Sequence, residues 1–220
     1  MLFVYPQKAY FGRKVPKSTF YQNLVPSAAQ RELMTQQLAR ITWLYKLSPS
    51  TINVNESDNV PEIQVFQLVL KPSVVAIDEQ VLHYLDKAIP SCLLFEVVQG
   101  ESIQPVACYK QKNANGSIAT SAYLYGEKQY KSAARNNLPV SRHFEHLYEQ
   151  LVAALLLHPK RTDETLSEAI SRCEAIAKLA NKVTSLEKRV RNKKLQFNKR
   201  TEINQQLKQA KADYNALLTE

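Results

Sequence analysis

Residues 61–98 constrain the fold of this chain more than any other stretch, because they contain a strand–helix–strand pattern. Residues 62–70 and 92–98 are apolar runs of strand length, and residues 78–89 between them have the spacing of an amphipathic helix. Two apolar strands joined by a packed helix are typical of a sheet with both faces covered. We therefore expect this stretch to form the centre of the sheet. The expected core positions are Ile63, Val65, Leu68, Leu93 and Phe95.

Further elements before residue 160 complete an α+β domain. Alternating apolar residues predict a strand at 41–47, and residues 103–111 and 118–125 predict two strands joined by a turn at Asn115–Gly116. Helical apolar spacing over residues 144–155 predicts a helix that covers the sheet. The sequence thus predicts a domain of residues 1–160 with a mixed or antiparallel sheet of about five strands and packed helices.

The composition changes after residue 160, because residues 162–220 contain neither glycine nor proline. Two series of apolar residues follow the three-and-four spacing of a coiled-coil seam. They are Ile176, Leu179, Val183, Leu186 and Val190, and then Ile203, Leu207, Ala210, Tyr214 and Leu217. The two series are out of phase, which predicts either a coiled-coil hairpin or one stuttered long helix. We expect residues 161–220 to form a separate, basic helical arm.

The chain carries 29 lysines and arginines against 20 acids, a net charge of +9 that favours polyanionic partners. Residues 188–200 concentrate seven of these cations without an acid. At the tip of a hairpin they would suit a phosphate backbone, DNA or RNA; the alternative is a solvated tip or one that meets an acidic protein. The predicted contacts on the arm are Arg189, Arg191, Lys193, Lys194, Lys199 and Arg200.

Aromatic and basic residues are interleaved in residues 1–26, where three prolines interrupt regular structure. Such a segment can offer cations to phosphates and rings to bases. The alternative is that the rings pack on the sheet while the lysines face water. Arg13 and Lys17 are the two candidates for nucleic-acid contacts in this segment.

Glu62 and Glu96 are weak catalytic candidates, because each carboxylate lies in one of the two central strands. Together with Asp58 and Lys110 they could form the carboxylate and lysine cluster of a divergent metal-dependent nuclease. The acid-x-Lys signature of such sites is missing, since Ile-Gln follows Glu62 and Val-Val follows Glu96. The sequence also lacks glycine-rich nucleotide-binding motifs and metal-ligand spacing, so we expect neither a cofactor nor a bound metal.

The expected compartment is the cytoplasm. Cys92, Cys108 and Cys173 form no Cys-x-x-Cys pair, which predicts reduced thiols. The first residues do not form a secretory signal, and the longest aliphatic run, residues 151–157, is too short to span a bilayer. We therefore expect no membrane partner.

Five strings of this sequence resemble a bacterial family catalogued as domain of unknown function four-three-nine-one. They are KAYFGRKVPK at 8–17, ITWLYKLSP at 41–49, VPEIQVF at 60–66, LDKAIP at 85–90 and QFNKRTEIN at 196–204. The resemblance spans the whole chain and implies an accessory protein encoded beside helicase and DNA-methyltransferase genes of restriction-like phage-defence systems. It makes Arg13, Lys17, Glu62 and Asp86 candidates for contacts, without any catalytic role.

The leading interpretation is a non-enzymatic accessory protein of a DNA-processing or defence system. Its basic helical arm would contact nucleic acid or a partner subunit, such as a helicase or a methyltransferase. Two alternatives remain open from the sequence. One is the nuclease that uses Glu62 and Glu96, and the other is a homo-oligomerisation module that pairs through the arm.

Overall fold

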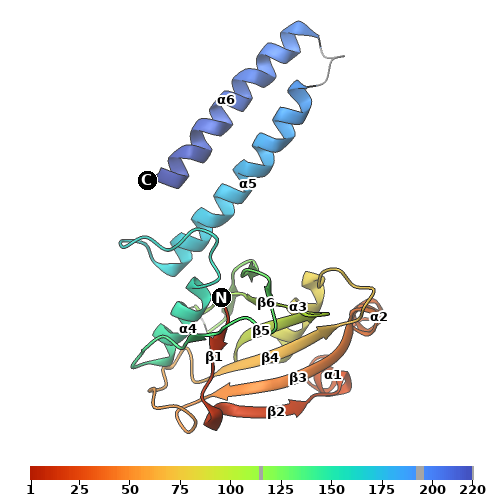
Figure 1. Cartoon of the computed structure of the whole chain (residues 1–220), viewed down its shortest axis with the longest axis vertical. Coiled ribbons are helices and arrows are strands. Elements are labelled where there is room, and N and C mark those ends of the chain that lie inside the picture. Colours follow the sequence, from red (N-terminus) through yellow and green to blue (C-terminus); the bar gives the residue numbers. More distant parts are fainter. Residues whose placement is uncertain (114–115, 192–195, 220) are drawn as a thin grey trace. The chain divides into compact units, whose positions relative to one another are not determined.

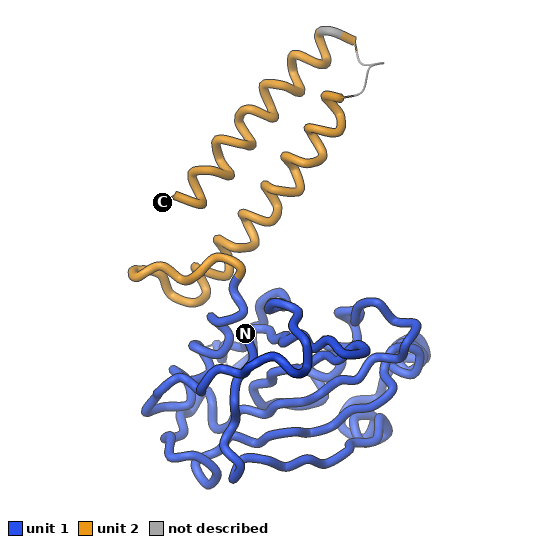
Figure 2. Tube along the Cα trace, in the orientation of Figure 1, with its two compact units in different colours: residues 1–156 blue, residues 157–220 orange. Residues whose placement is uncertain are grey.

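The computed structural model of the chain describes residues 1–113, 116–191 and 196–219. These residues form two compact units, residues 1–156 and residues 157–220 (Figure 2). Within the described part, no helix combines the length and the apolar character needed to cross a bilayer. Each unit is described by itself below.

Unit 1 is built on a mixed seven-stranded sheet (Figure 1). Its strands are β2 (Tyr10–Lys14), β3 (Leu38–Leu47), β4 (Ile63–Leu70), β5 (Cys92–Gln99), β6 (Ser102–Ala107), β9 (Leu124–Tyr125) and β10 (Gln129–Tyr130). Their order is β10-β6-β5-β4-β3-β2, and β9 also pairs with β6. β4 and β5 are parallel, and helix α3 (Glu79–Ala88) joins them; the other pairs are antiparallel.

The predicted α+β class and the central position of residues 61–98 are confirmed. The sheet has more strands than the five expected, because β9 and β10 are two-residue strands and β2 lies among the prolines of residues 1–26. Two small strand pairs lie outside the sheet. They are β1 (Phe3–Val4) with β11 (Asn136–Asn137), and β7 (Lys110–Lys112) with β8 (Ile118–Thr120).

β7 and β8 run antiparallel, with Lys112 beside Ile118. The strand predicted at 103–111 is therefore broken into β6 and β7. One cause lies at the break, where the Tyr109 backbone N–H donates to the Ser121 hydroxyl. Asn115 of the predicted turn lies outside the described residues.

One face of the sheet is covered by α1 (Lys17–Asn23), α2 (Ala28–Gln37) and α3. Leu93, Phe95 and Val97 of β5 point to this side and share a core with residues of all three helices. Two of the helices start at side-chain caps: Ser27 forms a capping box at α2, and Asp78 accepts from the Gln80 N–H at α3.

The other face of β5 carries Leu94, Glu96 and Val98, as strand alternation requires. Leu94 and Glu96 lie around a small gap that residues 1–5 and the end of α4 (Phe144–Ala153) also line. Val98 packs with Leu2. The first residues of the chain, which also include the turn η1 (Gln7–Ala9), therefore form part of the core of unit 1.

Unit 2 contains α5 (Leu166–Val190) and α6 (Phe197–Thr219), which run in opposite directions (Figure 1). Leu186 near the end of α5 packs with Ile203 near the start of α6. Conversely, the Arg161 guanidinium, just before α5, donates to the Leu217 carbonyl near the end of α6 at 2.8 Å. The helical C-terminal region is thus confirmed as two helices, whereas coiled-coil geometry stays a prediction.

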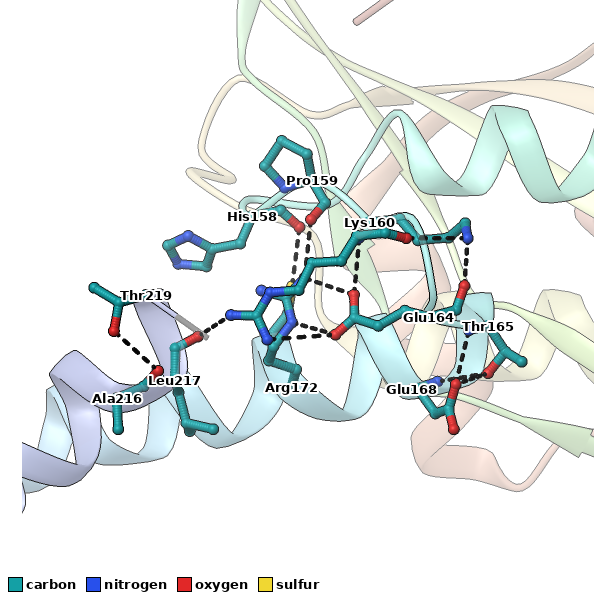
Figure 3. A network of polar contacts seen from close by, with 12 residues as sticks. His158, Pro159, Lys160, Glu164, Thr165, Glu168, Arg172, Ala216, Leu217 and Thr219 are labelled. Atoms are coloured by element: carbon teal, nitrogen blue, oxygen red, sulfur yellow. Dashed lines mark hydrogen bonds and ion pairs between the residues drawn. The ribbon is translucent and has the colours of Figure 1, made fainter.

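A polar network holds the segment before α5 (Figure 3). Arg172 on α5 donates from Nε to Glu164 Oε1 at 2.5 Å and from Nη2 to Glu164 Oε2 at 2.8 Å. Hydrogen bonds from the Arg172 side chain and the Arg161 backbone lower the pKa of Glu164 to about 2. Thr165 and Glu168 form the capping box that starts α5. These contacts hold the segment before α5 against the start of that helix.

Candidate nucleic-acid interface and buried ion pairs

The end of α5 and the start of α6 bring cations from two parts of the sequence to one end of unit 2. Arg189 lies in the last turn of α5, Arg191 is the first residue after α5, and both are exposed. Lys199 is exposed in the first turn of α6, and Arg200 beside it is half-buried. We call Lys188, Arg189, Arg191, Lys199 and Arg200 the basic end.

The basic end has the charge of a phosphate-binding surface. Among the described residues, no acid pairs with Arg189, Arg191 or Lys199. Cations at the C-terminal end of a helix also interact favourably with its dipole, so they add to the stability of α5. The predicted contacts Lys193 and Lys194 lie outside the described residues.

Arg13 and Lys17 differ in what they offer to a partner. Arg13 is exposed on β2, with its guanidinium 5.1 Å from the Phe11 ring centroid, and that ring packs at 4.3 Å on Trp43. Lys17 is half-buried and donates to the Leu38 carbonyl at 2.7 Å. Burial and the neighbouring Lys71 lower the pKa of Lys17. Arg13 is therefore available to a ligand, whereas the Lys17 ammonium is engaged in a hydrogen bond within the fold.

Glu62 lies directly before β4 within a set of hydrogen-bond donors. Lys46 Nζ is 3.0 Å from Glu62 Oε2, Ser91 Oγ donates to Oε1 at 2.9 Å, and the Gln64 amide donates to the same oxygen. Burial alone would raise the pKa of Glu62, but these donors outweigh it and lower the pKa. The carboxylate is held as a charged hydrogen-bond acceptor.

Glu96 is almost fully buried and forms a two-pronged ion pair with Arg135. The two guanidinium nitrogens Nη1 and Nη2 donate to Oε1 at 2.6 Å and to Oε2 at 2.9 Å. Nη1 also donates to the Phe3 carbonyl at 3.0 Å. The hydrogen bonds that Arg135 donates to Glu96 raise the pKa of Arg135, and burial raises the pKa of the adjacent Tyr5. Both carboxylate oxygens are thus occupied by a structural partner.

The structure does not bring Glu62 and Glu96 together. Glu96 lies beside Gln67 in the parallel register of β4 and β5, five positions beyond Glu62. That separation is about 16 Å along the strand, whereas carboxylates that share a metal ion lie within a few ångströms. Lys110 pairs with Asp86 and with neither glutamate. Across the described residues, no three His, Cys, Asp or Glu side chains gather as metal ligands.

Asp86 and Lys110 form the most deeply buried ion pair of unit 1. Lys110 Nζ lies 2.9 Å from Asp86 Oδ1, and the side chains of Lys110 and Asp86 are 6% and 5% exposed, respectively. The ammonium also donates to the carbonyls of Asp86, Ile89 and Ser91 at 3.2, 3.3 and 2.9 Å. Lys110 therefore caps the C-terminal end of α3 while it neutralises a carboxylate on the same helix.

The second oxygen of Asp86 is occupied as well. Tyr123 donates its hydroxyl to Oδ2 at 2.6 Å, and the Cys108 thiol lies 3.4 Å from the same atom. Burial first, and the Asp86 charge next, raise the pKa of both Tyr123 and Cys108. Both groups are therefore neutral hydrogen-bond donors at neutral pH, and Cys108 is not a thiolate nucleophile.

Comparison with known proteins gives a family. The family model described as "Domain of unknown function (DUF4391)" matches residues 3–213, nearly the whole chain. The chain belongs to the DUF4391 family. The match spans both units, so the α5–α6 pair is part of the DUF4391 domain along with the sheet. No curated protein and no solved structure matches the chain.

The Asp86–Lys110 centre of this DUF4391 chain is the feature that sequence reasoning missed. Lys110 entered the prediction as a possible partner of the two glutamates, and Asp86 only through the resemblance. One signal was available: an acid on the core side of an amphipathic helix is rare unless it is paired. The sequence offers no comparable signal for the pairing of Glu96 with Arg135, which is 39 residues away.

Proposed function

We propose that this chain is a non-enzymatic accessory protein that contacts a nucleic-acid backbone through the basic end of unit 2. The observation that carries the proposal is the convergence of exposed cations from α5 and α6, with no acid paired to Arg189, Arg191 or Lys199 among the described residues. Phosphate contacts need this kind of charge density and little shape specificity.

We propose in addition that α5 and α6 form a coiled-coil hairpin that presents this end. Leu186, Ile203 and Ala210 are buried in one cluster with Val183, Val190 and Leu207 beside them, which are positions of the two predicted seams. Arg13 on β2 would supply a second contact on unit 1. The resemblance to proteins encoded beside helicase and methyltransferase genes favours DNA, and such an enzyme subunit is the proposed partner.

A pair of double variants tests the proposal. Arg189→Gln with Lys199→Gln removes one cation from each helix at the basic end. Lys178→Gln with Lys208→Gln removes one exposed cation from each helix at positions at least ~12 Å along the axis from that end, so it matches the charge change.

Fluorescence anisotropy with a labelled duplex and a labelled single strand measures the affinities of both variants. We expect the first pair to weaken binding about tenfold or more and the second to weaken it much less. If both double variants lose the same affinity, the loss follows from net charge alone, and a localised interface is contradicted. If no nucleic acid binds at low salt, the basic end instead meets an acidic protein or a second copy of the chain.

A further inference from the structure

Two adjoining hollows lie along α3 in unit 1, each of about 280 Å³. Residues of α3, of segment 108–110 and of β8 line the first hollow. Residues of α2, α3 and segment 121–123 line the second. Four residues line both, namely His83, Lys87, Ser121 and Tyr123. The hollows therefore form one groove beside α3, and its size suits a small molecule better than a polymer.

The floor of the first hollow is the Asp86–Lys110 centre. Removing two charges from water is costly, and apolar residues in place of a buried ion pair often give a protein of equal or higher stability. Stability alone therefore does not account for the pair, and its place in the wall of a hollow agrees with a role in binding. Because the two charges cancel, the floor is neutral, with the Tyr123 hydroxyl and the Cys108 thiol turned to Asp86.

The rim of the first hollow carries the cation of Lys87. His83 and Lys87 lie one turn apart on the exposed side of α3, and no acid pairs with Lys87 in the part of the chain that the structure describes. The acid nearby, Glu79, lines the second hollow and accepts from the Tyr125 hydroxyl at 3.1 Å. Lys87 lines both hollows but Glu79 lines only the second, so an anionic group is favoured more in the first hollow than in the second.

The donor set suits a phosphate held by a point charge and a hydroxyl. Arginine forks bind carboxylates and phosphates alike, and no arginine lines this hollow, whereas lysine binds phosphates as a point charge. Lys87 supplies a point charge, and Thr120 on β8 adds an exposed hydroxyl. Pro90 and Ile118 offer apolar surface beside them, and Ile118 is 53% exposed.

From these features we infer that the first hollow binds a small organic phosphate. Its phosphate lies at Lys87 and Thr120, and its organic part rests on Pro90 and Ile118 above the Asp86–Lys110 floor. The site belongs to unit 1 and does not depend on the basic end of unit 2. The two proposals can therefore fail separately.

Calorimetric titration of the full chain with AMP, UMP and ribose 5-phosphate tests the site. Adenosine and inorganic phosphate serve as comparison ligands that each lack one half of the proposed ligand. Lys87→Gln removes the charge at the rim and Ile118→Ser removes the apolar contact; both side chains are exposed, so the fold tolerates the changes. Lys14→Gln, at an exposed lysine of β2, is the matched control.

We expect at least one of the three phosphates to bind, Lys87→Gln to weaken that binding about tenfold, and Lys14→Gln to leave it unchanged. Ile118→Ser weakens it about threefold through the lost apolar contact. Arg189→Gln with Lys199→Gln leaves it unchanged. The inference is overturned if none of the three binds below about 10 mM, if adenosine or inorganic phosphate binds equally well, or if Lys87→Gln has no effect.

Discussion

Lys110 Nζ lies 2.9 Å from Asp86 Oδ1 with both side chains almost entirely removed from solvent, and the same ammonium caps the helix that carries Asp86. This pair joins β7 to α3 and forms the floor of the proposed phosphate site. Its energetics are the first prediction.

Lys110→Met should lower the free energy of unfolding by about 3–5 kcal/mol, because it leaves the Asp86 carboxylate buried without its cation. Asp86→Leu combined with Lys110→Met should cost clearly less than the sum of the two single changes. Urea unfolding of the four proteins measures this coupling. Lys14→Met, on the exposed edge strand, serves as control and should stay within about 0.5 kcal/mol. Additive losses would contradict the buried pair.

A second prediction separates the two glutamates. Arg135→Leu should cost about 3–5 kcal/mol, because Glu96 would remain buried and charged. Lys46→Met should cost less than about 1 kcal/mol, because the Lys46 side chain is 39% exposed and Glu62 keeps its other donors. Chemical unfolding compares the two. Similar losses of stability for both changes would show that Glu96 contributes no more to the fold than Glu62 does.

A third prediction concerns pH and unit 2. The folded-state pKa of Glu164 is lowered to about 2, below the unfolded value of about 4.3. Its stabilisation is therefore complete above about pH 5 and is lost as pH falls from there toward 2. Thermal melts of the full chain followed by circular dichroism from pH 7 to 2.5 measure the effect. Glu164→Gln should melt lower at pH 7 and show a weaker acid dependence; an identical dependence in both proteins would exclude Glu164 as its source.

Cysteine reactivity provides a fourth prediction. Burial raises the pKa of Cys92 to about 11 and that of Cys108 further, so both are protonated thiols in the folded protein. Cys173 is only half-buried. Titration with a chromogenic disulfide reagent at pH 8 should therefore show one fast thiol in the native chain and three in denaturant. Cys173→Ser should remove the fast phase; fast reaction that survives this change would place a second thiol at the surface.

The parts of the fold that were predictable are those with strong local patterns. The apolar residues of 61–98 follow the spacing of strands and of a helix. Ser27 and Asp78 are of residue types that favour N-caps, and both cap helices in the structure. The apolar spacing after residue 160 likewise predicts helical structure, and the structure decides between one long helix and two by forming α5 and α6. Local preference and tertiary packing agree in these stretches, so a single sequence is sufficient.

The rest depends on contacts between residues far apart in the chain. β2 forms among prolines because it pairs with β3, and β9 and β10 are two-residue strands that exist only against β6. The role of Glu96 is decided by Arg135, and that of Asp86 by Lys110. The positions of Glu62 and Glu96 thus suggested catalysis, whereas the partner Arg135 gives Glu96 a structural role. Asp86, on α3, pairs with Lys110 in the wall of a ligand-sized hollow.

The salt dependence of duplex binding tests the central claim, a phosphate contact at the basic end, most directly. The observed binding constant of the unmodified chain is measured by anisotropy from low to moderate salt, beside that of the Arg189→Gln and Lys199→Gln double variant. We predict a steep linear fall of log K with log salt for the unmodified chain, and a slope shallower by about 2 for the variant. Equal slopes, or no binding at low salt, would contradict the claim.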